Sequence, residues 1–182
     1  WKNFQFPLLG PNSVTIDVNA KGAASVKGME YELTWLPLQN LTLTSSGAYN
    51  DGSLSGPYCR DQTVVCTDAI SESPKGTQLP ITPKWKLNGI ARYEWNIGGD
   101  YEAHIQGAVI HSSGTWSDLR LAERTLLGHN KSYTTFDFTT GIDRDKWALE
   151  LYVKNVFDER AQLGRYAECT PGTCGFEPYI LA

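Results

Sequence analysis

The sequence predicts an all-β fold, in which an antiparallel sheet crosses a membrane as a segment of a β-barrel. Three observations predict it. Strand-length runs alternate between apolar and polar residues, short and long connections alternate along the chain, and aromatic residues gather beside the short connections. An outer-membrane barrel combines these features, because it has short turns at one end, long loops at the other and aromatic girdles around its lipid-facing band.

Eight runs of the sequence have the pattern of strands, with the first and the last cut short. Within the longer runs, apolar residues alternate with polar or charged ones, as in a strand with one apolar and one polar face. A Gly-Gly-Asp turn at residues 98–100 separates two such runs and indicates a hairpin. In chain order, we expect strands at residues 1–6, 29–35, 41–46, 85–97, 101–109, 135–143, 147–154 and 178–182.

The alternation also predicts which side chains face lipid and which face the lumen. One face is bulky and apolar, and the other is dense in charge, as a wetted lumen would be. On the lipid side we expect Met29, Leu33, Trp35, Leu87, Trp95, Ile105, Leu149 and Leu151. On the lumen side we expect Glu32, Arg92, Glu94, Glu102 and Glu150.

The connections are of two kinds, and the two kinds alternate. The long loops cover residues 7–24, 51–82, 113–131 and 158–177. The turns between them, at residues 38–40, 98–100 and 144–146, are short. All short turns therefore lie at one end of the sheet and all long loops at the other. A soluble sandwich has no reason to sort its connections in this way, whereas an outer-membrane barrel does so.

Aromatic residues on the apolar face mark the two expected membrane boundaries. Beside the short turns lie Trp35, Trp95, Tyr101 and Trp147. Tyr49 and Trp85 approach the long-loop end and are expected in a second girdle. Trp and Tyr favour the membrane–water interface, because their rings are apolar with one polar group. The same rings would also fill the interior of a soluble sandwich, so the sorted connections are needed to favour the barrel.

Composition excludes several classes of protein. The 182 residues include 16 Lys and Arg against 20 Asp and Glu, a net charge of −4, whereas nucleic-acid-binding domains are usually basic. The sequence contains no run of 18 apolar residues, so it predicts no transmembrane helix. The start of the sequence has no signal-peptide pattern, so we expect a piece of a longer protein or a processed chain.

The four cysteines form two closely spaced pairs in turn-rich segments. Cys59 and Cys66 make one pair, and Cys169 and Cys174 make the other. Such local pairs favour two disulfides and an oxidising compartment. A zinc site would require two-residue spacings, which neither pair has.

Three segments resemble the barrel of TonB-dependent outer-membrane receptors. Residues 19–30 resemble the segment "NAGKA..KGVE" of that family, residues 79–85 resemble "LPxTPK", and residues 151–158 resemble "L.VKNLFD". Each motif alone is weak, but the three occur in the family's order and each falls at the expected end of its strand. The resemblance covers nearly the whole chain.

The resemblance implies a large barrel of about 22 strands with a plug domain in its lumen. Residues 1–182 would be about eight strands from the C-terminal part of the barrel domain, without the plug, the TonB-binding box or the final strand. It implies uptake of a scarce nutrient, such as siderophore-bound iron, cobalamin or a glycan, across the bacterial outer membrane. The implied partners are outer-membrane lipid, the TonB energy-coupling complex acting through the plug, and a small-molecule ligand. No enzymatic activity, cofactor, metal or nucleic acid is implied.

Residues in the long loops are the candidates for ligand contact, because loops carry function in such folds. Residues 115–127 predict a short helix, capped by Ser117 or Asp118 and ended by Gly128. The expected ligand-facing residues are Tyr58, Arg60, Asp61, Trp116, Arg120 and Arg124. The alternative for each of them is a loop residue that contacts only its neighbours.

Three other functions stay open on sequence alone. A passive pore or small structural barrel would share the strand pattern. An outer-membrane hydrolase would use His111, beside Ser112 and Ser113, although the sequence shows no orienting partner for it. A soluble, disulfide-stapled β-sandwich that binds a ligand would share the alternation and the cysteines.

Overall fold

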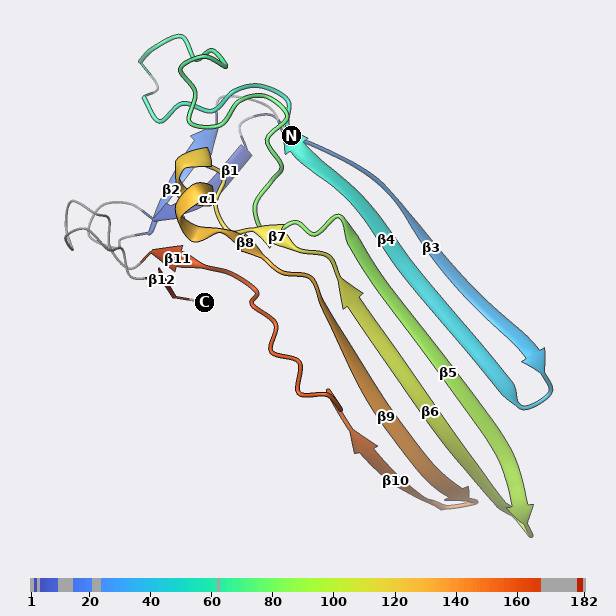
Figure 1. Cartoon of the computed structure of the whole chain (residues 1–182). Coiled ribbons are helices and arrows are strands. Elements are labelled where there is room, and N and C mark those ends of the chain that lie inside the picture. The colour runs from blue at the N-terminus through green and yellow to red at the C-terminus, as the bar shows by residue number, and fades with distance from the viewer. Residues whose placement is uncertain are drawn as a thin grey trace.

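The main body of the molecule is a six-stranded antiparallel sheet that rises from short turns to a bulkier loop end (Figure 1). The computed structural model describes residues 2, 4–9, 15–20, 24–61, 63–167 and 180–181. The sheet consists of β3 (Ala24–Leu38), β4 (Leu41–Leu54), β5 (Trp85–Gly98), β6 (Tyr101–Ser112), β9 (Tyr133–Arg144) and β10 (Trp147–Val153).

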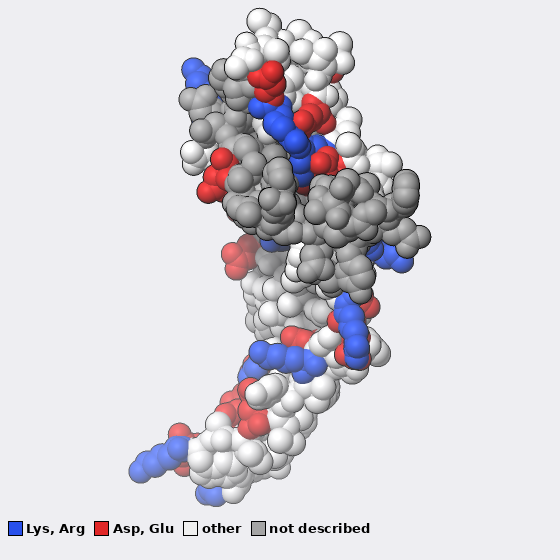
Figure 2. Space-filling model, turned by 90° about the vertical axis from the view of Figure 1, so that its left-hand side faces the viewer, with Lys and Arg blue, Asp and Glu red and all other residues white. Residues whose placement is uncertain are grey.

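Sheet order follows chain order, so each of these strands pairs with its neighbours in sequence. The predicted all-β antiparallel class is therefore confirmed. The sheet is open, with β3 and β10 at its edges, so the barrel is not closed within this chain. Figure 2 shows the strand portion as a narrow, bowed strip below the loop end.

The cross-strand register confirms the predicted division into two faces. Trp95, Ala103, Ile142 and Leu149 form one row across four strands, and Glu94, His104, Gly141 and Glu150 form the next row on the opposite face. All eight residues expected toward lipid share the face of Leu149, called the apolar face below. All five residues expected toward the lumen share the face of Glu150, called the polar face.

The apolar face has aromatic clusters at both ends. Near the short turns, Tyr101 and Trp147 meet edge to face with ring centres 5.9 Å apart, and the Arg144 guanidinium lies 4.6 Å from the Tyr101 ring centre. Near the loop end, the Tyr49 and Trp85 rings lie 4.7 Å apart. These positions match two interfacial girdles.

Two strands are about twice as long as the alternation predicts. β3 has 15 residues and β4 has 14, whereas the predicted runs end at residues 29 and 46 on the loop side. A barrel strand needs about 9–11 residues to cross the hydrocarbon. The extra residues extend the hydrogen-bonded ladder beyond the lipid, where side-chain alternation is no longer required.

The N-terminal region differs from the prediction. Residues 7–24 were expected as a loop, but β1 (Phe4–Leu9) and β2 (Thr15–Ala20) form a separate two-stranded hairpin. β1 overlaps the strand expected at residues 1–6, whereas β2 lies wholly within the expected loop, although its residues alternate between polar and apolar. The expected strand at residues 178–182 corresponds to β12 (Ile180–Leu181), which pairs with β11 (Tyr166–Ala167) and not with the main sheet.

Most of the buried apolar residues lie at the loop end, whereas Ala103, which is 4% exposed, lies within the sheet on β6. The buried cluster consists of Ala24, Leu54, Tyr58, Leu79 and Leu119. On the sheet, Met29 and Leu151 keep about two thirds of their surface exposed, at 67% and 66%. The described residues contain no helix long and apolar enough to cross a membrane.

Candidate ligand-facing loop platform

Loop segments at the end of the sheet opposite the short turns form one body, which we call the loop platform. It consists of residues 55–61 and 63–84 between β4 and β5, residues 113–132 between β6 and β9, and residues 162–167 after β10. The second segment contains β7 (Thr115–Trp116), α1 (Leu121–Leu127) and β8 (His129–Asn130). Figure 1 shows α1 and the β7–β8 pair beside the upper ends of the long strands.

Backbone pairing and a disulfide shape the first segment. Tyr58 and Ser73 form an antiparallel bridge, and the amide of Tyr58 donates to the Ser73 carbonyl over 2.8 Å. Cys59 and Cys66 form a disulfide, with Cα atoms 5.7 Å apart. This linkage confirms one predicted pair. Cys169 and Cys174 lie outside the described residues, so their linkage stays a prediction.

The first and second segments are joined by hydrogen bonds in a buried environment. The Ser73 hydroxyl donates to the Leu119 carbonyl over 2.9 Å, and both residues are fully buried. The amide of Leu121, the first residue of α1, donates to the Glu72 carbonyl over 3.0 Å. Buried polar groups require such partners, so the two segments are expected to order together.

Arg120 is fixed by two carboxylates. Its Nε and Nη2 atoms contact the two Asp118 carboxylate oxygens at 3.0 and 2.8 Å, and its Nη1 atom lies 2.8 Å from Glu123 Oε1. Burial acts to lower the pKa of Arg120, but the hydrogen bond and charge of Asp118 outweigh it, so the pKa lies above its ordinary value. The Arg120 side chain is 6% exposed, which leaves little surface for a ligand.

Arg124 links the two segments from its place in α1. Its Nε donates to the Asp118 carbonyl over 2.8 Å, and its Nη2 donates to the Gln78 carbonyl. The guanidinium also lies 5.2 Å from the centre of the Trp116 ring, a cation–π distance. Burial lowers the pKa of Arg124, because the charged form loses contact with water.

Tyr58 and Arg60 both interact with Glu72. The Arg60 guanidinium lies 3.2 Å from a Glu72 carboxylate oxygen and keeps 60% of its side chain exposed. Tyr58 is buried, and this burial, followed by the charge of Glu72, raises the pKa of its phenol. Asp61 is exposed and accepts hydrogen bonds from the Thr63 hydroxyl and amide, which lower the pKa of its carboxyl.

The predicted helix is shorter than expected, and its N-terminal cap is different. α1 begins at Leu121 and not at residue 115, and Arg120 occupies the N-cap without a side-chain cap. Asp118 instead accepts from the Arg120 amide over 2.8 Å, and the Ser117 hydroxyl accepts from the Arg165 amide over 2.7 Å. Gly128 ends the helix as predicted, with a φ of 72° that favours glycine.

Arg165 brings the third segment into the platform. Besides its amide contact with Ser117, its Nη1 donates to the Leu127 carbonyl, the last of α1, over 2.9 Å. A cation at a helix C-terminus is favourable. The platform is therefore tied together across three connections that lie far apart in the sequence.

The structure brings five of the six predicted residues into contact networks and leaves Asp61 apart. Tyr58 and Arg60 meet through Glu72, whereas Arg120, Arg124 and Trp116 are grouped around Asp118. Of the anchoring partners, the sequence analysis named Asp118 only as a possible helix cap, and it did not single out Glu72 or Gln78. Of these contacts, only the ion pair between Asp118 and Arg120 could have been predicted from the sequence, because the two residues are close in the chain.

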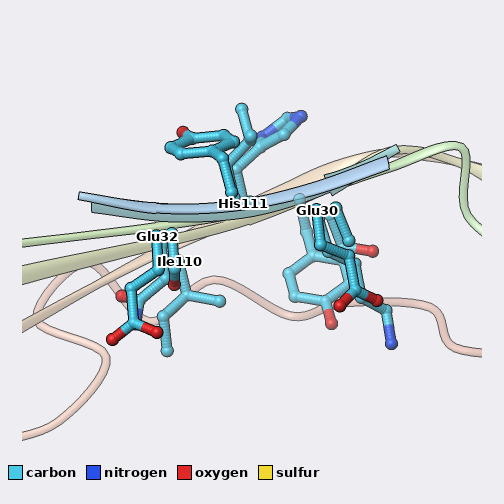
Figure 3. A pocket seen from close by; sticks show the side chains of 13 residues that line it. Glu30, Glu32, Ile110 and His111 are labelled. Carbon is cyan, nitrogen blue, oxygen red and sulfur yellow. The ribbon is translucent and has the colours of Figure 1, made fainter. Parts of the chain in front are cut away.

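The polar face of the sheet has a shallow hollow of about 630 Å³ between β3 and β6. Glu30, Glu32 and Ile110 lie on this side of the sheet, and His111 lies on the other (Figure 3). His111 Nδ1 lies 2.8 Å from the Thr134 hydroxyl. Among the described residues, no carboxylate forms an ion pair with His111, so the arrangement gives no support to the hydrolase alternative.

Among the described residues, no cluster of three or more His, Cys, Asp or Glu side chains is arranged to hold a metal ion. The site therefore consists of loop side chains and a charged sheet face.

Comparison with known proteins decides the family. The sequence matches the family described as "TonB dependent receptor-like, beta-barrel" over residues 1–156. The chain belongs to the TonB-dependent receptor family. Its strands therefore form part of the wall of a receptor barrel, in a family of bacterial outer-membrane receptors and transporters and not of enzymes.

A solved structure has the same fold as this receptor segment. The siderophore receptor PiuA from Acinetobacter baumannii aligns with a TM-score of 0.57 and 19% sequence identity, over 96% of this chain. The aligned region is 22% of that receptor, so the chain spans about a fifth of its length. No curated protein matches the sequence.

Proposed function

We propose that the receptor containing this chain takes up a scarce nutrient across the bacterial outer membrane. The candidate nutrients are siderophore-bound iron, cobalamin and a glycan. The family match carries the proposal, because it covers most of the chain. The name of the aligned siderophore receptor favours a siderophore among the three.

Within this proposal, the loop platform faces the nutrient. Arg60 and Asp61 are exposed, and Trp116 is partly exposed, so their side chains are available for contact. Tyr58, Arg120 and Arg124 act mainly by holding those residues in place. The energy for transport comes from TonB, acting through a plug domain that belongs to the rest of the receptor.

The experiment is an uptake assay with the intact receptor in cells. Radiolabelled ferric siderophores, cobalamin and oligosaccharides are supplied in turn to cells with and without TonB. We expect accumulation of one of them only when both the receptor and TonB are present. Equal accumulation without TonB would support a passive pore, and no accumulation of any of them would overturn the proposal.

Loop variants test where the ligand binds. If Arg60 makes a charged hydrogen bond to the nutrient, Arg60→Ala should weaken binding about tenfold or more. Arg160→Ala is the matched control, because the Arg160 side chain is 85% exposed and forms an ion pair with Asp158, whose side chain is 77% exposed. Equal affinity in the two variants would remove Arg60 from the site while leaving the uptake proposal intact.

A further inference from the structure

The row of side chains nearest the short turns places an arginine on the lipid-facing side of the sheet. Arg144 at the end of β9 pairs with Trp147 at the start of β10, and Tyr101 at the start of β6 contacts both side chains. By the alternation of their strands, all three residues share the apolar face. Figure 1 shows the β5–β6 and β9–β10 turns, which flank this row, at the same end of the sheet.

Tyr101 holds the guanidinium of Arg144 in place. Arg144 Nη1 donates to the Tyr101 hydroxyl over 2.7 Å, and the guanidinium carbon lies 4.6 Å from the centre of the Tyr101 ring. The other side of this arrangement is the Trp147 ring, which meets the Tyr101 ring edge to face at 5.9 Å. A cation–π contact and a hydrogen bond to the same residue restrict the arginine side chain, which is otherwise long and flexible. Arg144 stays partly exposed in this position.

Arg144 has no anionic partner in the part of the chain that the structure describes. No carboxylate there forms an ion pair with it, whereas Arg92 on the polar face pairs with Glu94 at 2.7 Å. Asp145, the next residue in the chain, is exposed and does not pair with Arg144. The Tyr101 hydroxyl accepts only one of the N–H groups of the guanidinium. The remaining donors are therefore available to an anion from outside the described chain.

The depth of Arg144 on the wall corresponds to the boundary between hydrocarbon and headgroups. The adjacent row on the same face is wholly apolar and consists of Trp95, Ala103, Ile142 and Leu149. Successive rows on one face are two residues apart along a strand, which is about 7 Å. Trp and Tyr favour this boundary, and long basic side chains reach from it toward the headgroups. The anion that a membrane supplies at this depth is the lipid phosphate.

The chemistry of the row fits a phosphate. The planar guanidinium of Arg144 can donate to two phosphate oxygens at once, and such hydrogen bonds are charge-assisted. The Tyr101 hydroxyl accepts from Arg144 and keeps its own proton to donate. Lys146, exposed in the β9–β10 turn, adds a second positive charge. The turns also contain Asp100 and Asp145, and Figure 2 shows basic side chains with acidic ones beside them at the tip of the sheet. The attraction is therefore local to Arg144 and does not come from a net positive end.

We propose that Arg144, positioned by Tyr101, binds the phosphate of a phospholipid at the short-turn boundary of the barrel wall. The occupant is a lipid and not free phosphate, because the Tyr101 and Trp147 rings and the adjacent apolar row provide a surface for its glycerol and acyl chains. The contact fixes the depth of β9 and β10 in the membrane. It lies at the end of the sheet opposite the loop platform and does not depend on which nutrient the receptor binds.

The experiment maps lipid contacts of the intact receptor by photo-cross-linking. The vesicles consist of digalactosyl diacylglycerol, which has no phosphate, with a small fraction of phosphatidylglycerol that carries a photoactivatable group in its headgroup. Mass spectrometry of the digest gives the cross-link yield at residues 98–102 and 144–147. The variant is Arg144→Gln. Arg160→Gln is the matched control, because it removes the same charge from a side chain that is 85% exposed and lies beyond β10.

We expect Arg144→Gln to lower the phosphatidylglycerol yield at these residues about tenfold, because its charge-assisted hydrogen bonds to the phosphate are lost. Arg160→Gln should keep the native yield. The same photoactivatable group on the galactolipid should give equal yields in the native and Arg144→Gln receptors, which shows that the turns keep their shape. Equal phosphatidylglycerol yields in these two receptors would overturn the proposal.

Two further measurements test the role of Tyr101 and the source of the phosphate. Tyr101→Phe keeps the ring and loses the hydroxyl, so it should lower the phosphatidylglycerol yield and leave the galactolipid yield unchanged. An excess of inorganic phosphate in the buffer should not reduce the native yield, and a reduction would show a site for free anions in place of a lipid site. If Arg144→Gln does not fold, Arg144→Lys replaces it, because lysine loses the planar pair of donors. An unchanged phosphatidylglycerol yield in that variant would then contradict the proposal.

Discussion

At the scale of single residues, Asn155 shows how a strand of the wall is interrupted. It follows β10 with a φ of 50°, in the left-handed region that asparagine tolerates better than most residues. Its amide donates to Asp137 Oδ1 over 2.8 Å, and its side chain makes two hydrogen bonds of 3.0 Å to the Glu159 backbone. The amide of the next residue, Val156, donates a hydrogen bond to the Phe136 carbonyl. The asparagine of the 151–158 motif therefore closes a turn.

Substitution of Asn155 separates its backbone role from its side-chain role. Asn155→Gly keeps the left-handed backbone accessible and loses only the hydrogen bonds to Glu159. Asn155→Ala loses both, so we expect it to be the less stable variant by about 1 kcal/mol. Hydrogen exchange of residues 155–160 in the intact receptor measures this difference, and equal exchange in the two variants would show that the backbone conformation carries no cost.

A second residue-scale prediction concerns the direction of neighbouring side chains on β9. Phe138 faces the apolar side and lies six residues from the turn at Arg144, roughly 14 Å into the membrane for a tilted strand. Phe138→Arg should lower the free energy of unfolding in lipid vesicles by about 2–4 kcal/mol, because the charge meets hydrocarbon. Thr139→Arg, on the opposite face, should cost less than half of this. A larger loss for Thr139→Arg would reverse the assignment of the two faces.

At the scale of elements, the sheet and the loop platform differ in what holds them together. Neighbouring strands are joined by a regular backbone ladder, whereas the platform depends on a few buried side chains between distant segments. Arg124 makes three such contacts, to Asp118, Gln78 and Trp116. The platform is therefore expected to loosen without any change in the barrel wall.

We expect Arg124→Ala to make the platform accessible to protease while leaving the melting temperature of the barrel unchanged. Truncation leaves the carbonyls of the half-buried residues Gln78 and Asp118 without their donor, which typically costs about 1–3 kcal/mol locally. The measurement is limited proteolysis of the intact receptor, with cleavage sites mapped by mass spectrometry. Arg160→Ala serves as control, and indistinguishable digestion of the two variants would show that Arg124 does not hold the platform.

The difference between the regular sheet and the loop platform also explains which parts of the structure could be predicted from the sequence. Lipid on one side and water on the other impose a two-residue period, so alternation was enough to place Leu149 and Glu150 on opposite faces and to pair consecutive strands. The contacts within the loop platform leave no such regular pattern in the sequence. Arg124 and Gln78 are 46 residues apart, as are Ser73 and Leu119, and nothing local marks either pair. The helix start was misplaced because Ser117 and Asp118 have partners outside the helix.

The disulfides are a further prediction at this scale. Closure of the short loop between Cys59 and Cys66 contributes up to about 2–3 kcal/mol of local ordering by the chain-entropy estimate. Cys169 and Cys174 are predicted to form the second linkage. Mass spectrometry of an unreduced digest should yield the two pairs separately. Crossed pairs that join residues 59–66 to residues 169–174 would contradict this pairing.

At the scale of the whole molecule, the open sheet predicts how residues 1–182 behave when expressed alone. The edges β3 and β10 have unpaired backbone groups, which invite association with other chains. The apolar face exposes large side chains in water, including Trp35 at 59% and Leu149 at 59%. We expect aggregation in detergent-free buffer, measured by light scattering. A stable monomer with cooperative thermal unfolding would favour the soluble sandwich.

The most direct test of the membrane wall is a spin-label scan along β6 in the intact receptor in lipid vesicles. Labels placed singly at residues 101–111 report collisions with oxygen, which concentrates in lipid, and with a water-soluble nickel complex. Because side chains alternate along a strand, we predict high oxygen accessibility at odd positions such as Ile105 and low accessibility at even ones such as Gln106. Oxygen accessibility without a two-residue period, or with its maxima at the even positions, would contradict a wall that faces lipid with its apolar side.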